Sequence, residues 1–246
     1  MRGWRCLARL FAVLALPASA LAEDPVAEEI PASLRMLSDQ ALEARLADAI
    51  ETLDYGETYA DVWWYGWTGF YALGAIIQTV AASTNDHDSD GRTADKVVGA
   101  VKAAGGVAGQ LLRPSTAADG ADPVRALPDR NREDRLRRLM IAEDRLRRRA
   151  RESDQRYSLL RHGLNVGINV TGALIVWQGF DEKTRAWRSA GVGIAVGEVM
   201  LWSQPWWGRS DLEAYDQRNH IRIPPPVDVS WHLVPTTGGA ALMVRF

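Results

Sequence analysis

The feature that most limits how this chain can fold is a run of 21 residues, 62–82, that contains no charged side chain. An uncharged stretch of about 20 residues is long enough for a helix to cross a bilayer. Tryptophan and tyrosine crowd the first half of the run, as they do where membrane helices meet the lipid headgroups. A buried helix of a soluble bundle would share these properties. The run therefore predicts a long apolar helix and leaves its surroundings open.

Two further apolar segments, residues 163–180 and 190–207, follow in the second half of the chain. The segment between them, 181–188, is mostly polar, so the two are predicted to form an antiparallel helical hairpin. Another helix, rich in small residues, is expected at 96–112. Glycines four residues apart allow helices to approach closely. Such pairs occur at Gly105 and Gly109, at Gly163 and Gly167, and at Gly193 and Gly197.

The first 22 residues have the features of a secretory signal peptide. Three arginines precede an apolar run at 10–16, and small residues at 18–22 form a cleavage site. The mature protein is therefore expected to begin at Glu23 and to lie outside the cytoplasm. The one cysteine of the chain, Cys6, falls in this segment, so neither a disulfide nor a cysteine nucleophile is expected in the mature protein.

A long helix is predicted between residues 129 and 157. The hexapeptide Glu-Asp-Arg-Leu-Arg-Arg occurs at 133–138 and again at 143–148, and this period is close to three helical turns. The apolar residues form a narrow seam of the coiled-coil kind, interrupted at Glu143 and Ser153. The seam consists of Leu136, Leu139, Leu146, Ala150, Tyr157 and Leu160.

Twelve arginines and seven acidic residues make the stretch 129–161 basic. A basic stretch indicates an anionic partner, and export favours membrane lipid over nucleic acid. If residues 62–82 cross a membrane, we expect residues 83–161 on the cytoplasmic side. The arginines would then follow the excess of positive charge that is typical of cytoplasmic loops.

The predicted fold is mainly α, with helical hairpins, one long Arg-rich helix and a C-terminal β-hairpin. Ser38 is expected to cap a helix whose apolar stripe is Leu42, Leu46, Ile50 and Leu53. The predicted order is a signal peptide at 1–22, an N-terminal helical region at 23–112, a linker at 113–129, the long helix and apolar hairpin at 130–212, and a tail at 213–246.

The tail alternates apolar and polar residues at 227–233 and at 242–246, on either side of turn residues at 235–239. This pattern predicts the β-hairpin. The last strand ends in Phe246 and resembles the last strand of outer-membrane β-barrel proteins, which would allow an association with the outer membrane. The rest of the chain lacks the eight or so strands that such a barrel needs, so no barrel is predicted.

An acidic loop at 86–91 starts like a calcium-binding loop, but Val97 stands where the final bidentate glutamate is needed. A solvated acidic loop is therefore the preferred interpretation. The histidines lack the spacing that places two metal ligands on one helix face. No catalytic, cofactor-binding or metal-binding residue is predicted. The four histidines are His87, His162, His220 and His232.

Glu198 lies midway along the third apolar segment. An acid inside an apolar span is costly and is normally paired. His162, Asn165 and Asn169 on the facing helix are the predicted partners, with Arg161 as a further candidate. The contact is interpreted first as an interhelical hydrogen bond that fixes helix register, and second as a polar, proton-sensitive site within the membrane.

These features favour an exported, non-enzymatic cell-envelope protein, in the inner membrane or the periplasm, with a structural or interaction role and no cofactor. Membrane lipid is the expected partner, followed by self-association or another envelope protein. The alternative is a soluble periplasmic helical bundle that binds a lipid or another apolar ligand in a tryptophan-lined groove. A hydrolase that uses Glu198 and His162 as an acid–base pair is the weakest interpretation, since the sequence offers neither a nucleophile nor a metal site.

Overall fold

The computed structural model describes residues 29–84 and 89–221, together with the backbone of two strands in the tail. The chain divides into two compact units, Met1–Tyr215 and Asp216–Phe246. The described part of the first unit is built from helices, which confirms the predicted mainly α class for this unit.

A set of charged helices, named the head, packs around α3 and α7. α3 (Asp39–Asp54) begins after Ser38, whose hydroxyl accepts a backbone hydrogen bond, so the predicted N-cap is confirmed. α7 (Arg132–Asp154) begins after Asn131, which caps it in the same way. The other helices of the head are α2 (Ala32–Arg35), α6 (Asp122–Arg125) and α10 (Gly208–Arg218) as far as Tyr215.

The head has an apolar core between α3 and α7. Leu42 and Leu53 of α3 and Leu139 and Leu146 of α7 are at most 1% exposed. The predicted linker belongs to this core, because it contains α6 and buries Val124 completely. The helices before and after residues 113–129 therefore form one body.

The apolar seam of α7 is shorter than predicted. It is buried as far as Ala150, and both polar interruptions are buried with it. η2 (Gln155–Tyr157) then turns the chain into the next helix. Tyr157 and Leu160 leave the face that α3 covers and are exposed, so their place in the seam was predicted wrongly.

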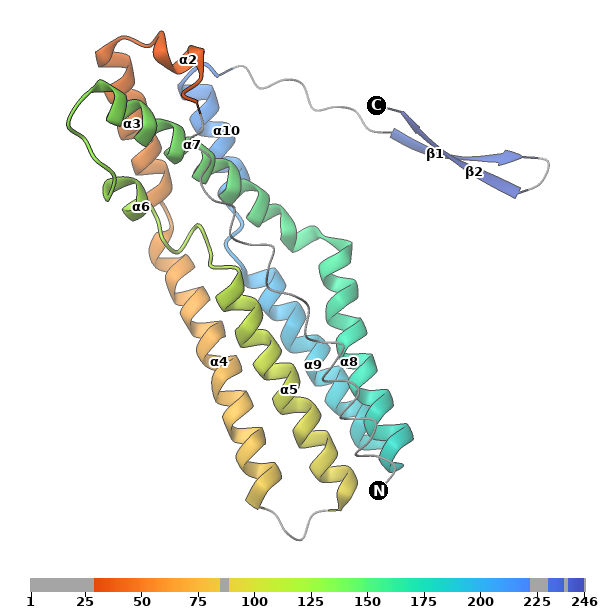
Figure 1. Cartoon of the computed structure of the whole chain (residues 1–246). Coiled ribbons are helices and arrows are strands. Elements are labelled where there is room, and N and C mark those ends of the chain that lie inside the picture. Colours follow the sequence, from red (N-terminus) through yellow and green to blue (C-terminus); the bar gives the residue numbers. More distant parts are fainter. Residues whose placement is uncertain (1–28, 85–88, 222–229, 237–238, 246) are drawn as a thin grey trace. The chain divides into compact units, whose positions relative to one another are not determined.

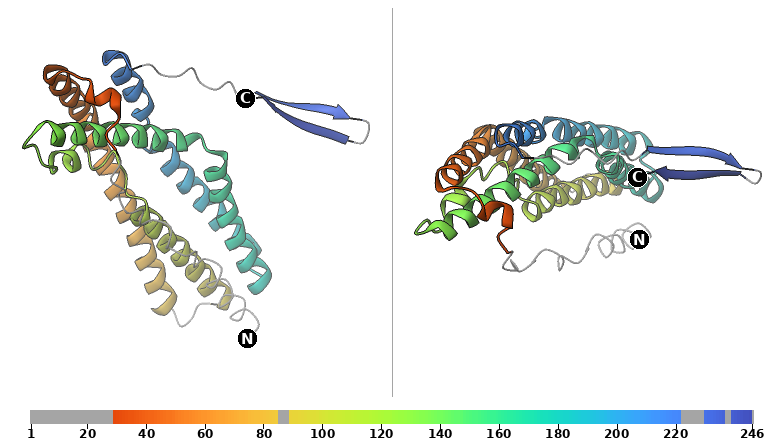
Figure 2. Two further views of the ribbon diagram at one scale, coloured as in Figure 1. Left: turned by 45° about the horizontal axis from the view of Figure 1, so that its top comes forward. Right: turned by 90° about the horizontal axis from the view of Figure 1, so that it is seen from above.

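Four long helices form the rest of this unit, which is named the bundle (Figure 1). They make two antiparallel hairpins, α4 with α5 and α8 with α9, and α5 contacts both α8 and α9. α7 crosses one end of the bundle and leads through η2 into α8 (Figure 2). The four helices are α4 (Glu57–Thr84), α5 (Asp90–Leu112), α8 (Leu159–Phe180) and α9 (Lys183–Ser203).

The hairpin of α8 and α9 is antiparallel as predicted, but its turn is tighter. Only Asp181 and Glu182 separate the helices. Asp181 has a φ of 60°, a left-handed conformation that aspartate adopts more readily than most residues. The predicted polar connection at 181–188 is otherwise helical, because Ala186 lies on the buried face of α9.

Only one of the three predicted glycine pairs lies against another helix. A Cβ atom at Gly193 would overlap the Asn169 side chain, and one at Gly197 would overlap that of Asn165. A spacing of four predicts that two glycines share a face, but not which face meets a neighbour. At the other two pairs, Gly105 with Gly109 and Gly163 with Gly167, an added Cβ atom would meet nothing within 4 Å among the described residues. The close approach predicted for these pairs was wrong.

The arginines of α7 are largely paired with acids of the head rather than left for an anionic partner. Arg132 pairs with Asp39 and Arg135 with Glu43, and both acids belong to α3. Buried Glu143 accepts from Arg45 Nε at 2.7 Å and from Tyr215 Oη at 2.9 Å. Other ion pairs join Arg138 to Asp129, Arg145 to Asp119, Arg148 to Asp144 and Arg149 to Asp211.

This packing corrects the predicted position of residues 83–161. Because α4 and α5 form an antiparallel hairpin, the chain returns to the end of the bundle from which it left. α7 then packs on α3, so both helices lie on one side of any membrane that the bundle crosses. The prediction that the arginine-rich stretch lies opposite the N-terminal region was wrong.

The second unit contains two strands. β1 (Ser230–Thr236) pairs with β2 (Gly239–Arg245) in antiparallel register, with Trp231 opposite Val244. Residues 222–229 and 237–238 and the side chains of the strands lie outside the described part of the chain. The β-hairpin therefore stays a prediction.

Candidate functional site

A polar contact joins α8 and α9 at the residues named from the sequence. Asn165 Nδ2 donates to Glu198 Oε1 at 2.9 Å, and His162 Nδ1 lies 2.7 Å from Glu198 Oε2. His162 Nε2 lies 2.8 Å from the carbonyl oxygen of Arg156. A carbonyl and an ionised carboxylate can only accept, so this arrangement needs one proton more than a neutral imidazole beside a carboxylate. The histidine–glutamate pair is then neutral overall.

The contact continues from α8 to α5. Asn169 Nδ2 donates to Asn165 O at 2.9 Å, and Lys102 Nζ donates to Asn169 Oδ1 at 3.0 Å. The structure thus pairs Glu198 with His162 and Asn165 and links Asn169 to it through Asn165. Arg161 makes no hydrogen bond or ion pair with Glu198 among the described residues, so this candidate partner was predicted wrongly. The structure adds Lys102, which the sequence analysis missed. The only sign of Lys102 in the sequence is its position, as a charged residue midway along the predicted small-residue helix at 96–112. The polar chain is defined as His162, Glu198, Asn165, Asn169 and Lys102.

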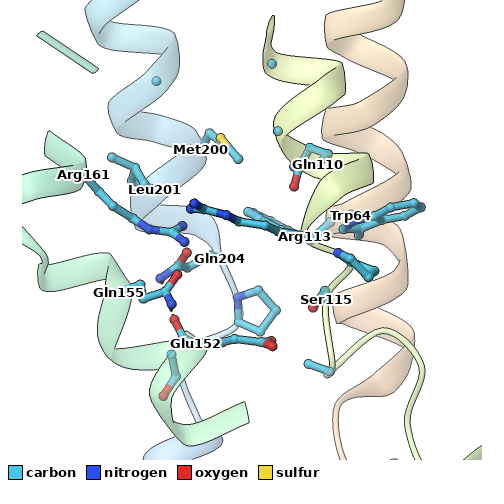
Figure 3. A pocket seen from close by; sticks show the side chains of 18 of the residues that line it. Trp64, Gln110, Arg113, Ser115, Glu152, Gln155, Arg161, Met200, Leu201 and Gln204 are labelled. Carbon is cyan, nitrogen blue, oxygen red and sulfur yellow. Dashed lines mark hydrogen bonds between the residues drawn. The ribbon is translucent and has the colours of Figure 1, made fainter. Parts of the chain in front are cut away.

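A pocket of about 720 Å³ lies beside the polar chain, where the bundle meets the head (Figure 3). Its volume is within the range of about 300–1,000 Å³ that is usual for small-molecule sites. Residues of α4, α5, α7, α8 and α9 line it. Apolar walls come from Leu112, Leu164, Met200 and Leu201, and polar walls from Gln110, Arg113, Glu152, Gln155, Arg161 and Gln204.

Glu152 is fixed at the wall of the pocket by Thr116. Thr116 N donates to Glu152 Oε2 at 3.0 Å, and Thr116 Oγ1 donates to Glu152 Oε1 at 2.5 Å. Burial raises the pKa of Glu152, and the hydrogen bonds from Thr116 oppose that shift. Thr116 therefore hydrogen-bonds to both carboxylate oxygens of Glu152 and fixes the orientation of the side chain.

Aromatic side chains gather at both ends of the bundle. At the end near the head, Trp63 Nε1 of α4 donates to Ser203 Oγ at 3.1 Å, beside Trp202 at the end of α9. At the other end, the rings of Trp177 and Trp187 lie 6.1 Å apart. Trp187 and Trp202 are 15 residues apart on α9, or about 23 Å along the helix axis. This separation approaches the hydrocarbon thickness of a bilayer, about 30 Å.

The outer face of α4 is apolar and uncovered. Ala60 is the only buried residue among the 28 of this helix. Leu73 is 58% exposed and Ile77 is 56% exposed. Ile168 of α8 and Val192 of α9 are exposed as well. The burial expected of a core helix in a soluble bundle is therefore not found in α4.

One helix in the described part of the chain, α8, is long and apolar enough to cross a membrane. It has 22 residues and a mean hydropathy of 1.2 over its most apolar window, of which 22% is buried. This measure concerns length and composition only, and core helices of soluble proteins can meet it. The apolar run 62–82, in α4, does not reach the same hydropathy.

No group of three histidine, cysteine or acidic side chains able to hold a metal ion occurs among the described residues. Of the acidic loop, residues 85–88 lie outside them, and Asp90 and Gly91 form the start of α5. The interpretation of this loop as solvated therefore stays a prediction. His87 and the side chain of His232 also lie outside the described part.

Comparison with known proteins finds no matching family model, no similar curated protein and no similar solved structure.

Proposed function

We propose that this chain is an exported, non-enzymatic cell-envelope protein that is anchored in a membrane by its bundle. The head would lie at one membrane surface and serve a structural or interaction role. Lipid is then the main partner of the bundle, and another envelope protein or a second copy is the partner of the head.

The observation that carries this proposal is the uncovered apolar surface of the bundle. Large exposed apolar areas on a protein mark a partner or a membrane. The exposed side chains are spread over several helices, including Leu73 of α4, Ile168 of α8 and Val192 of α9. Lipid covers all helices at once, whereas a single protein partner covers one face. The spread therefore favours a membrane.

The interior of the bundle supports the same proposal. Ionisable residues within membrane proteins face the inside of the bundle and pair with one another. Glu198 pairs with His162, and Lys102 donates to Asn169. Both nitrogens of the His162 ring are occupied by the glutamate and a backbone carbonyl. A role in bundle register fits these contacts better than an acid–base role, which needs a ring nitrogen free for substrate.

The hairpin arrangement also predicts the orientation. The far ends of both hairpins, Thr84 and Ser89 in the first and Asp181 and Glu182 in the second, lie at the end of the bundle away from the head. With an export signal before residue 23, the head is expected outside the cytoplasm and both turns inside. In the tail, we propose that residues 227–246 form the β-hairpin, supported by their alternating pattern.

Alkaline carbonate extraction combined with cysteine labelling tests the proposal. Single cysteines are introduced by Arg151→Cys in the head and Asp181→Cys in the turn, with Cys6 replaced by serine. We expect the protein to stay in the membrane pellet. A membrane-impermeant maleimide should label the head position in intact cells lacking the outer-membrane barrier, and the turn position only after the inner membrane is opened. Release by carbonate, with both positions labelled, would overturn the anchoring.

A second candidate is the soluble periplasmic bundle that binds a lipid or another apolar ligand. The pocket of about 720 Å³ favours it, because Trp63 and Trp64 line one side. This candidate predicts purification without detergent and a rise in thermal stability when lipid is added. Aggregation of the purified protein without detergent would count against it.

A further inference from the structure

Two arginines meet in the pocket without an acidic partner. Arg113 follows the last residue of α5, and Arg161 lies in the first turn of α8. Their guanidinium groups point toward each other across the pocket (Figure 3). Neither arginine forms an ion pair with a described residue. This differs from α7, where acids neutralise most arginines.

The other charged groups of the pocket do not supply a counter-ion. Arg149 forms an ion pair with Asp211, with 2.9 Å between Arg149 Nη2 and Asp211 Oδ2. Glu152 also lines the pocket, but it hydrogen-bonds to Thr116 and forms no ion pair with either arginine among the described residues. One carboxylate thus accompanies two guanidinium groups. The space between the two arginines therefore carries an excess of positive charge.

A buried donor without a partner lines the same pocket. Gln110 is only 6% exposed, and its Nε2 atom has no hydrogen-bond acceptor among the described residues. The Nε1 atom of Trp64, which also lines the pocket, is buried and has no acceptor among the described residues. A buried donor that lacks a partner costs about 1–3 kcal/mol, and native proteins keep few of them. Both donors are available to a ligand in the pocket that carries hydrogen-bond acceptors.

The remaining wall is apolar, with Leu164 of α8 and Met200 and Leu201 of α9. A small inorganic anion bound between the arginines would make no contact with these apolar side chains. Trp63 also lines the pocket, at the level of the aromatic side chains next to the head. Aromatic levels mark the lipid headgroups in membrane proteins.

We propose that the pocket binds the phosphate group of an anionic lipid between Arg113 and Arg161, with its acyl part against Leu164 and Met200. Two guanidinium groups can bind phosphate oxygens through paired hydrogen bonds. Gln110 and Trp64 supply further donors. The proposal deepens the membrane function, but the arginine site does not depend on the bundle crossing a bilayer.

Calorimetric titration of the purified mature protein in non-ionic detergent tests the site. The probes are dihexanoyl phosphatidylglycerol, dihexanoyl phosphatidylcholine and inorganic phosphate. The anionic lipid should bind at least about tenfold more tightly than the other two, since only it combines net negative charge with an apolar part. Equal binding of inorganic phosphate would overturn the lipid assignment, and equal binding of phosphatidylcholine would overturn the anion site.

Arg113→Gln and Arg161→Gln should each weaken binding of phosphatidylglycerol by about tenfold or more. Arg151→Gln, an exposed arginine of α7 outside the pocket, is the matched control and should bind as the unchanged protein does. Unchanged affinity in both pocket variants would overturn the proposal. Carbonate extraction of the same variants keeps the two proposals apart, because loss of lipid binding should leave the anchoring intact.

Gln110→Leu provides a second test that leaves both arginines in place. It removes a buried unpaired donor, so the ligand-free protein should be at least as stable to heat. Its affinity for phosphatidylglycerol should nevertheless fall by about fivefold, the value of one hydrogen bond. A purely structural glutamine would show the reverse, with lower stability and unchanged affinity.

Discussion

The head and the bundle differ in where their large apolar side chains lie. In the head, Leu139 is fully buried between α3 and α7, and ion pairs such as Arg148 with Asp144 lie at the surface. In the bundle, Leu73 of α4 points outward, and the polar chain around Glu198 lies between helices. The hydrophobic effect favours the first arrangement in water, whereas the second suits a solvent that is itself apolar. This difference is the basis of our proposal that the head lies in water and the bundle in a membrane.

Arg149 is the residue on which the head depends most. It is 2% exposed and donates to the carbonyl oxygens of Thr52, Leu53 and Tyr55 at the end of α3 and to Asp211 of α10. Replacing it with methionine removes its hydrogen bonds to three carbonyl oxygens and its ion pair with Asp211. We expect a loss of about 3–5 kcal/mol in unfolding free energy, measured by denaturant titration followed by circular dichroism.

Arg148→Met is the control for that change, because this neighbouring arginine forms an exposed pair with Asp144. Exposed pairs contribute about 0–1 kcal/mol. If both variants lost the same small amount, the head would not be a water-soluble fold held by its buried arginine.

A matched pair of leucine truncations compares the two regions directly. Leu139→Ala in the head should cost about 2–5 kcal/mol, because it leaves a cavity in a closed core. Leu73→Ala on the outer face of α4 removes a side chain that is 58% exposed and leaves no cavity. In detergent, thermal unfolding should show a large effect for the first and almost none for the second. Similar losses in both would mean that a protein surface covers α4.

Gly193 tests the contact between α8 and α9. A Cβ atom there would overlap the Asn169 side chain, so Gly193→Ala should cost about 1–3 kcal/mol through overpacking. Gly191→Ala is the control, since nothing lies within 4 Å of that position. The measurement is thermal unfolding of both variants. Equal stability of the two would contradict the side-chain packing described for the polar chain.

The smallest expected effect concerns pH and Glu152. Because burial raises the pKa of this carboxyl in the folded protein, the folded state binds more protons than the unfolded state just above the ordinary pKa. The free energy of unfolding therefore falls as pH rises through that range. Glu152→Gln removes this loss, so the variant should gain stability relative to the unchanged protein between acid and neutral pH.

Unfolding titrations at a series of pH values check this sign. Glu51→Gln, an exposed glutamate of α3, is the control for the loss of one negative charge. The opposite result is that the stability of Glu152→Gln, relative to the unchanged protein, falls as pH rises. It would show that the hydrogen bonds from Thr116 lower the pKa of Glu152 more than burial raises it.

Much of this arrangement follows from local patterns in the sequence. The period of apolar residues predicts the face that α7 buries, and the cost of an isolated acid in an apolar segment predicts the partners of Glu198. Features that depend on distant segments could not be predicted in this way. The pairing of Arg132 with Asp39 requires the hairpin of α4 and α5 to bring α7 back to α3. In the same way, Arg113 and Arg161 stand at the ends of different helices and meet only in the folded bundle.

Spin-label accessibility on the outer face of the bundle decides whether lipid surrounds α4. Nitroxide labels are attached after Leu73→Cys and Ile77→Cys, with Arg148→Cys in the head as reference, in protein reconstituted into vesicles. We expect oxygen, which partitions into lipid, to relax the α4 labels strongly, and a water-soluble nickel complex to reach only the head label. Strong relaxation of the α4 labels by nickel, or protection from both reagents, would contradict it, because α4 would then face water or protein.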